Sequence, residues 1–132
     1  MLVLLKREPG APSDVTSKPS VRPASGEDEH RFLACAQCMS QITTPRAGIS
    51  VAGNHEHTVS NPEGQSFRIG CFASVTGCVG IGPRSTYWTW FAGHAWQVAL
   101  CRSCRIQLGW LFAGAQRFHG LILDRLVEAD SA

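Results

Sequence analysis

Apolar and polar residues alternate in several short runs of this chain, and turn residues separate the runs. The run from Ser66 to Ala73 places Phe67, Ile69 and Cys71 on one face, and the run from Ile106 to Phe112 alternates in the same way. A period of two residues is typical of a half-buried β-strand. We expect further strands over residues 49–52, 55–59, 75–81, 95–101 and 118–127. No run has the period of a long helix, so the pattern predicts an all-β sheet protein.

Glycine, proline and asparagine mark where these strands end. Gly53-Asn54 supplies a turn, and the segment Asn61-Pro62-Glu63-Gly64 has proline at the second position and glycine at the last. Both are turn signals. Gly82-Pro83 is expected to end the strand over residues 75–81. Residues 85–93 are expected to form a loop with exposed aromatic side chains.

The first 30 residues differ in composition from the rest of the chain. They contain Pro9, Pro12, Pro19 and Pro23, with serines between them and no apolar period. Such a segment is predicted to be a disordered tail. We expect the folded domain to span residues 31–128 and a short C-terminal tail to span residues 129–132. The start of the chain lacks the pattern of a signal peptide, and no apolar stretch reaches the length of a membrane span, so we expect a cytoplasmic protein.

The four cysteines of two CxxC pairs predict a metal site. The pairs are Cys35-x-x-Cys38 and Cys101-x-x-Cys104, and a spacer of two residues lets both sulfurs of a pair reach one ion. Four thiolates leave no open coordination position, so a structural zinc ion is expected. The alternative is a disulfide or redox pair, which a chain without an export signal or a βαβ pattern disfavours. We expect the two remaining cysteines, Cys71 and Cys78, to be small buried residues.

Two histidines, His55 and His57, alternate on a predicted strand. A second metal site there is the alternative to hydrogen-bonded or surface histidines. Because no third ligand accompanies them, we favour the reading without a metal.

All four tryptophans lie close to the second cysteine pair, at Trp88, Trp90, Trp96 and Trp110. Aromatic residues usually pack in the core of a small domain. Trp88 and Trp90, however, fall in a predicted loop, where a ligand pocket is the better interpretation. Such a pocket suits a quaternary ammonium, a nucleobase or a small neutral ring.

The charge pattern favours the neutral ring. No Asp or Glu lies between Glu63 and Asp124, whereas five arginines fall inside that span: Arg68, Arg84, Arg102, Arg105 and Arg117. A cation reader benefits from a nearby carboxylate, so a cationic ligand is disfavoured. The net charge of +2 argues against nucleic acid as the main partner.

The motifs occur in a recognisable order. After the first CxxC pair come NPEG at Asn61–Gly64, GPRSTYWTWFAGHAW from Gly82 to Trp96, CRSC at Cys101–Cys104 and LGWLF from Leu108 to Phe112. In these motifs the chain resembles the thalidomide-binding (CULT) domain of the cereblon family, in particular its bacterial single-domain members. The resemblance covers residues 31–128, which is nearly all of the predicted folded part.

The resemblance implies a fold and a pocket. The fold is a β-tent of two antiparallel sheets that meet at an angle and are pinned by one zinc ion on the four cysteines. The pocket is walled by Trp90, Trp96 and Trp110, with Phe112 at its floor. Trp88 stands where the vertebrate protein has a histidine.

The resemblance also implies how the pocket reads its ligand. The backbone carbonyl of Trp88 accepts a hydrogen bond from the imide N–H, and the amide of Trp90 donates to an imide oxygen. Asn61 flanks the mouth of the pocket, and Phe67 packs over the ligand. Trp88 is therefore a binding residue through its main chain.

These inferences predict a non-enzymatic binding domain for cyclic imides. The expected ligands are the glutarimide of thalidomide-type compounds, uracil- or uridine-like rings, and cyclic imides at protein C-termini. Alternatives are an enzyme that acts on cyclic imides, with His94 as the only titratable group close by in the sequence, and a single-stranded nucleic-acid binder. We expect a monomer without nucleic-acid or membrane partners. We also expect no ubiquitin-ligase partner, because the chain has no room for the vertebrate docking segments.

Overall fold

Nine strands and two short 3-10 turns make up the part of the chain that the structure describes, residues 30–130 of a computed structural model. Of the predicted tails, over residues 1–30 and 129–132, residues 1–29 and 131–132 lie outside the described residues. Ala129 and Asp130 were expected in the C-terminal tail but belong to the last strand, where they pair with the first one. The strands are β1 (Arg31–Cys35), β2 (Gln41–Thr43), β3 (Glu56–Ser60), β4 (Ser66–Phe72), β5 (Cys78–Ser85), β6 (Ala95–Cys101), β7 (Gln107–Ala113), β8 (Arg117–Ile122) and β9 (Leu126–Asp130), and the turns are η2 (Pro45–Ala47) and η3 (Leu123–Arg125). No helix of the described residues is long and apolar enough to cross a membrane.

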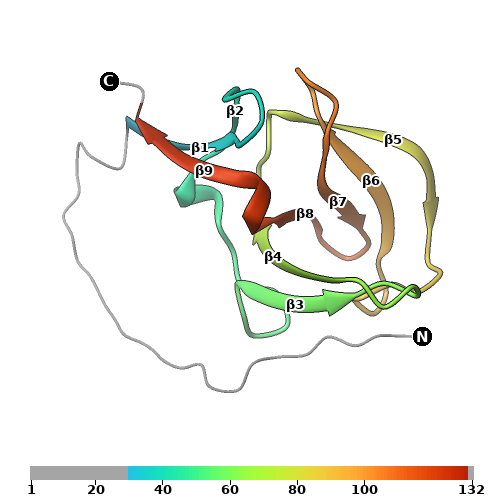
Figure 1. Cartoon of the computed structure of the whole chain (residues 1–132). Helices are drawn as coiled ribbons and strands as arrows, with labels where there is room; N and C mark the ends of the chain where they lie inside the picture. Colours follow the sequence, from blue (N-terminus) through green and yellow to red (C-terminus); the bar gives the residue numbers. More distant parts are fainter. Residues whose placement is uncertain (1–29, 131–132) are drawn as a thin grey trace.

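The strands form two antiparallel sheets, which confirms the predicted all-β fold. The small sheet has the order β2-β1-β9, and the large sheet has the order β3-β4-β8-β7-β6-β5. The large sheet curls, so that the tip of the β3–β4 hairpin comes to lie beside the loop between β5 and β6, while the small sheet covers the opposite end (Figure 1).

Most predicted strands occur where the alternation placed them, and β6 agrees in both of its bounds. Three expectations were wrong. Residues 49–52 form only an isolated bridge, from Val51 to Asn54, around the predicted Gly53-Asn54 turn. Gly82-Pro83 does not end a strand, because β5 continues to Ser85 through an irregularity in its pairing with β6. The run over residues 118–127 is divided by η3 into β8 and β9.

The break at η3 explains how one continuous apolar run serves two sheets. Before the break, β8 pairs with β4 and β7 in the large sheet. After the break, β9 pairs with β1 in the small sheet, with Cys35 opposite Leu126. A turn of three residues therefore carries the chain from one sheet to the other.

The core consists of two clusters, one on each side of the large sheet. One cluster lies where the small sheet meets the large one and contains Ile42 and Leu108. The other lies inside the curl of the large sheet and contains Phe91, Phe112 and Phe118. Because successive residues of a strand point to opposite faces, β4 contributes to both clusters.

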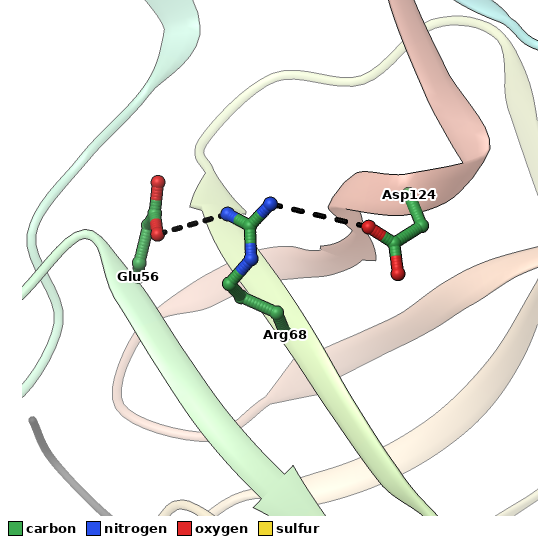
Figure 2. A network of polar contacts seen from close by, with 3 residues as sticks. All are labelled: Glu56, Arg68 and Asp124. Atoms are coloured by element: carbon green, nitrogen blue, oxygen red, sulfur yellow. Dashed lines mark hydrogen bonds and ion pairs between the residues drawn. The ribbon is translucent and has the colours of Figure 1, made fainter.

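An exposed ion-pair network joins β3, β4 and η3 (Figure 2). Arg68 of β4 contacts Glu56 of β3 at 3.1 Å and Asp124 of η3 at 3.9 Å. All three side chains are at least half exposed, so each pair contributes little to stability. The segment between Glu63 and Asp124 contains no Asp or Glu (the acid-free span). The network shows that acidic residues outside this span form ion pairs with an arginine inside it.

His119 of β8 provides a prediction about stability in acid. Burial, with a smaller contribution from the charge of Arg117, lowers the pKa of His119 to about 4 from its ordinary value of 6.5. Between these values the unfolded chain takes up the proton first, so stability falls as the pH drops through this window. We expect His119→Gln to reduce the loss in the free energy of unfolding between pH 7 and pH 5 by about 2 kcal/mol.

Urea unfolding of the zinc-loaded protein and the His119→Gln variant at both pH values measures this difference. Any zinc released in acid affects the two proteins alike, so the comparison isolates the histidine. Equal losses of stability in the two proteins would contradict the prediction.

Candidate functional site

The two CxxC segments fold into matching knuckles. The amide of Met39 donates to the carbonyl of Cys35 at 2.7 Å, and the amide of Arg105 donates to the carbonyl of Cys101 at 2.9 Å. Met39 and Arg105 both have a positive φ, 67° and 72°. Residues other than glycine rarely adopt this backbone conformation, which costs about 1 kcal/mol or more. An interaction outside the turn must therefore stabilise each knuckle.

The four thiol groups converge on one point between the two sheets. Their sulfur atoms all lie within 4.8 Å of one another. Cys35 and Cys104 are 3.7 Å apart, as are Cys38 and Cys101, and no cysteine of the described chain forms a disulfide. A tetrahedron of sulfurs about 2.3 Å from zinc has edges of about 3.8 Å. The geometry therefore fits one structural zinc ion and excludes the disulfide alternative for these four residues.

The surroundings of the sulfurs favour thiolates bound to a cation. The Ser40 hydroxyl lies 3.1 Å from the sulfur of Cys38 and 3.6 Å from that of Cys101, and the first contact lowers the pKa of Cys38. Burial acts to raise the pKa of Cys101, but backbone hydrogen bonds and Ser40 outweigh it and lower that pKa to about 6. Burial raises the pKa of Cys35 to about 11, so a cation is needed to hold this group as thiolate at neutral pH.

The other two cysteines and the histidine pair have no such arrangement. Cys71 and Cys78 are buried in the core clusters, and burial raises the pKa of each to about 12. His55 contacts the carbonyl of Ile49, and His57 contacts the carbonyl of Val51, each at 3.0 Å. Among the described residues only the four knuckle cysteines cluster as possible metal ligands. The hydrogen-bonded histidines and the buried cysteines are as expected.

A cavity of about 560 Å³ opens between the β3–β4 hairpin, the loop after β5 and the strands β6 and β7. Its lining includes six of the seven residues expected from the sequence: Asn61, Phe67, Trp88, Trp90, Trp96 and Trp110. The loops and strands that carry these residues are far apart in the chain, and the curl of the large sheet brings them together.

The indole N–H groups hold the walls of the cavity in place. Trp88 and Trp90 both donate to the carbonyl of Ser60, at 2.8 and 2.9 Å. Trp96 donates to the carbonyl of Tyr87 at 2.7 Å. Each of these three indoles has one N–H donor, and that donor is already bonded to a backbone carbonyl. A ligand can therefore contact their ring faces but not their N–H groups.

The rings also support one another. The rings of Trp90 and Trp110 meet edge to face with centroids 4.7 Å apart, and Phe67 approaches Trp110 at 5.4 Å. Phe112, expected at the floor, is fully buried and does not line the cavity. Its ring lies 6.3 Å from that of Trp90, so it supports this wall from behind.

The loop between β5 and β6 contains a strained turn at Trp88. The amide of Thr89 donates to the carbonyl of Thr86, and Trp88 has a φ of 60°. A positive φ at the third position of a turn usually requires glycine or asparagine, so the conformation costs about 1 kcal/mol or more. The bond from the Trp88 indole to Ser60 fixes this loop against the hairpin.

Asn61 organises the hairpin tip. Its side-chain oxygen accepts hydrogen bonds from the amides of Glu63 and Gln65, and its side-chain nitrogen donates to Gln65. The amide of Gly64 donates to the carbonyl of Asn61, which confirms the predicted turn. Asn61 thus shapes the cavity mouth with its polar atoms already engaged.

Sequence reasoning missed the charged and polar residues of the cavity. Glu63, Gln107 and Arg125 all line it. Glu63 bounds the acid-free span and belongs to the hairpin tip, so the premise that no carboxylate lies near the indoles is corrected. Gln107 and Arg125 come from β7 and η3, and no local pattern marks them as neighbours of the tryptophans.

The comparisons with curated proteins point to the same family as the motifs. No family model matches the chain. The chain is 32% identical to protein cereblon of Danio rerio over 109 residues and 32% identical to protein cereblon of Gallus gallus over 111 residues. These matches cover 76% and 74% of the chain but only 25% of each relative, so the chain spans about a quarter of their length. With the four-cysteine site and the two sheets, the similarity establishes that this chain contains a cereblon-like domain built around one structural zinc site.

Proposed function

We propose that the cavity binds small cyclic imides and does so without chemical change. The observation that carries the proposal is a pair of main-chain groups on the cavity-lining loop. The carbonyl of Trp88 and the amide of Trp90 make no hydrogen bond to any described residue. One acceptor and one donor, two residues apart, match the N–H and C=O of an acyl–NH–acyl edge.

The walls suit the remainder of such a ring. Indole faces contact apolar ring carbons, and their N–H groups are already bonded. A buried imide edge is stabilised only when both of its hydrogen bonds are formed, since an unmet donor or acceptor costs about 1–3 kcal/mol. The site should therefore reject an imide whose nitrogen carries a methyl group. Uracil-like rings and C-terminal cyclic imides of proteins share this edge and are the candidate natural ligands.

A tryptophan-fluorescence titration with glutarimide tests the proposal. We expect saturable quenching with a roughly micromolar dissociation constant, given the ceiling on affinity per atom for so small a ligand. N-methylglutarimide, the matched control, should give no saturable response. Absence of a response to both compounds would overturn the assignment while leaving the zinc-bound fold intact.

Replacing Trp96 tests the aromatic wall. In Trp96→Ala the cavity loses a ring face and the hydrogen bond to the Tyr87 carbonyl, so we expect glutarimide to bind at least about tenfold more weakly. Trp96→Phe keeps a ring and should lose less. Calorimetry measures both variants, and circular dichroism and zinc content report whether they fold. Unchanged affinity in the folded alanine variant would contradict the role of Trp96.

A second candidate ligand is a small organic cation, which the place of Glu63 on the cavity favours. Indole faces attract quaternary ammonium ions, and a nearby carboxylate strengthens the attraction. Tetramethylammonium is the probe in the same titration. Binding of this ion, without binding of glutarimide, would replace the imide by a cation.

Turnover is tested by following the imide over time. His94 does not line the cavity, and its Nδ1 contacts the carbonyl of Ala92 at 2.9 Å. We expect glutarimide to be recovered unchanged after prolonged incubation with the protein. Appearance of the ring-opened acid would support an enzyme instead.

A further inference from the structure

One end of the cavity is formed by an arginine that has no acidic partner. The carbonyl of Arg125 accepts a hydrogen bond from Ala36 in the first knuckle, and its Nη1 donates to the carbonyl of Gln107 at 2.7 Å. Its side chain therefore spans from η3 to β7, and both Gln107 and Arg125 line the cavity. No ion pair joins Arg125 to a carboxylate among the described residues.

The guanidinium of Arg125 therefore places a positive charge beside the aromatic cavity, and most of its N–H donors are unused. A guanidinium has five N–H donors, and the contact with Gln107 uses one of them. A half-buried cation usually has an anionic partner, because burial of an unpaired charge is costly. The neighbouring acid, Asp124, is 79% exposed and directs its carboxylate to Arg68.

Arg125 lies at one end of the cavity, and the loop between β5 and β6 that carries Trp88 and Trp90 lies at the other end. Trp96 pairs with Phe112 near the start of β6, next to that loop, whereas Gln107 pairs with Leu100 near the end of β6. Four residues of a strand span about 13 Å. A six-membered ring held at the loop leaves room toward Arg125 for a short substituent, as the cavity volume of about 560 Å³ allows.

We propose that the cavity selects cyclic imides that carry a negatively charged group on the side of the ring opposite the imide edge, with Arg125 as the partner of that group. This inference rests on the proposed imide function and adds the ligand's charge to it. A carboxylate there forms charge-assisted hydrogen bonds, which are about twice as strong as neutral ones, and the planar guanidinium suits its two oxygens. Glu63 is the other charged lining residue, but it is exposed at the hairpin tip, where water screens it.

The test compares two glutarimides that differ only in charge. One carries an acetate on the ring carbon opposite the nitrogen, and the other carries the corresponding acetamide. We expect the zinc-loaded protein to bind the acetate about tenfold more tightly, a preference that decreases as salt is added. Arg125→Gln should abolish the preference, so that the acetate and the acetamide bind this variant with equal affinity.

The control variant is Arg46→Gln, which removes an exposed arginine of η2 that does not line the cavity. It should keep the full preference, and loss of preference there would assign the effect to overall charge and overturn the role of Arg125. An acetate that binds no better than the acetamide, or a preference that persists in Arg125→Gln, overturns the inference while imide binding stands. If plain glutarimide does not bind the unchanged protein, the proposed function fails and this inference with it.

Plain glutarimide also reports whether Arg125→Gln keeps its cavity. If that variant does not fold, Arg125→Lys is compared in its place, since it keeps the charge without the planar fork. The lysine variant should retain a smaller, salt-sensitive preference for the acetate. A lysine variant that binds plain glutarimide but not the acetate in preference to the acetamide overturns the inference.

Discussion

Cys101→Ser should leave the chain unfolded at room temperature even with zinc present. Four thiolates contribute on the order of 10 kcal/mol to folding through a structural zinc ion, whereas a domain of this size has a net stability of about 5–15 kcal/mol. Cys101 is the last residue of β6, and its amide donates a hydrogen bond to the carbonyl of Ile106 across the second knuckle. Loss of this ligand therefore releases the small sheet from the large one.

Circular dichroism and zinc analysis of the purified variant measure this effect, together with a thermal melt of the unchanged protein before and after a chelator is added. The control is Cys71→Ala, which removes a buried thiol that is not a ligand. It should lose about 1–2 kcal/mol and keep its zinc. A Cys101→Ser protein with the melting temperature of the Cys71→Ala control would contradict the prediction.

The strands were predictable where local alternation and burial agree. In β4, the face predicted to be buried, Phe67, Ile69 and Cys71, packs in one cluster as expected. The alternation does not reveal that Phe72 belongs to the other cluster. The alternation also does not reveal the break at η3. The sequence pattern of an apolar run is the same whether the run forms one strand or two strands in different sheets.

The candidate site divides in the same way. Cysteine spacing is a local signal, so the zinc ligands followed from the sequence. Trp88 and Trp90 were placed on a loop because Ser, Thr and Gly surround them. The far end of the cavity depends on tertiary structure alone, since Gln107 and Arg125 meet only after β7 and η3 are packed.

The zinc site and the cavity share structure through η3. Arg125 binds the first knuckle by its carbonyl and the wall of the cavity by its guanidinium. The second knuckle lies directly between β6 and β7, which carry Trp96 and Trp110. A zinc ion held by the four cysteines would therefore fix the ends of the strands that carry the aromatic walls. With four thiolate ligands it would have no free coordination position for a second ligand.

Gly109→Ala should be strongly destabilising although it lies outside the zinc site. Gly109 of β7 lies opposite Leu121 of β8. A Cβ added at Gly109 would overlap the carbonyl oxygen of Gly120 and lie 2.9 Å from the Cα of Leu121. Both are backbone atoms of a central strand pair, so neither can move aside as a side-chain end would. We expect the free energy of unfolding to fall by about 3 kcal/mol or more, from strain and from weakened ladder hydrogen bonds.

The same substitution should also weaken ligand binding, because the next residue is Trp110, whose ring lines the cavity. The matched control is Gly80→Ala on the edge strand β5, where the added Cβ meets only the end of the Gln97 side chain, at 2.5 Å. That amide can turn away, so the cost should stay below about 1 kcal/mol. Urea unfolding and glutarimide titration of both zinc-loaded variants measure the two effects. Equal stability of the two variants would contradict the expected strain between β7 and β8. Equal affinity of the two variants for glutarimide would contradict the dependence of the cavity wall on the close approach of these strands.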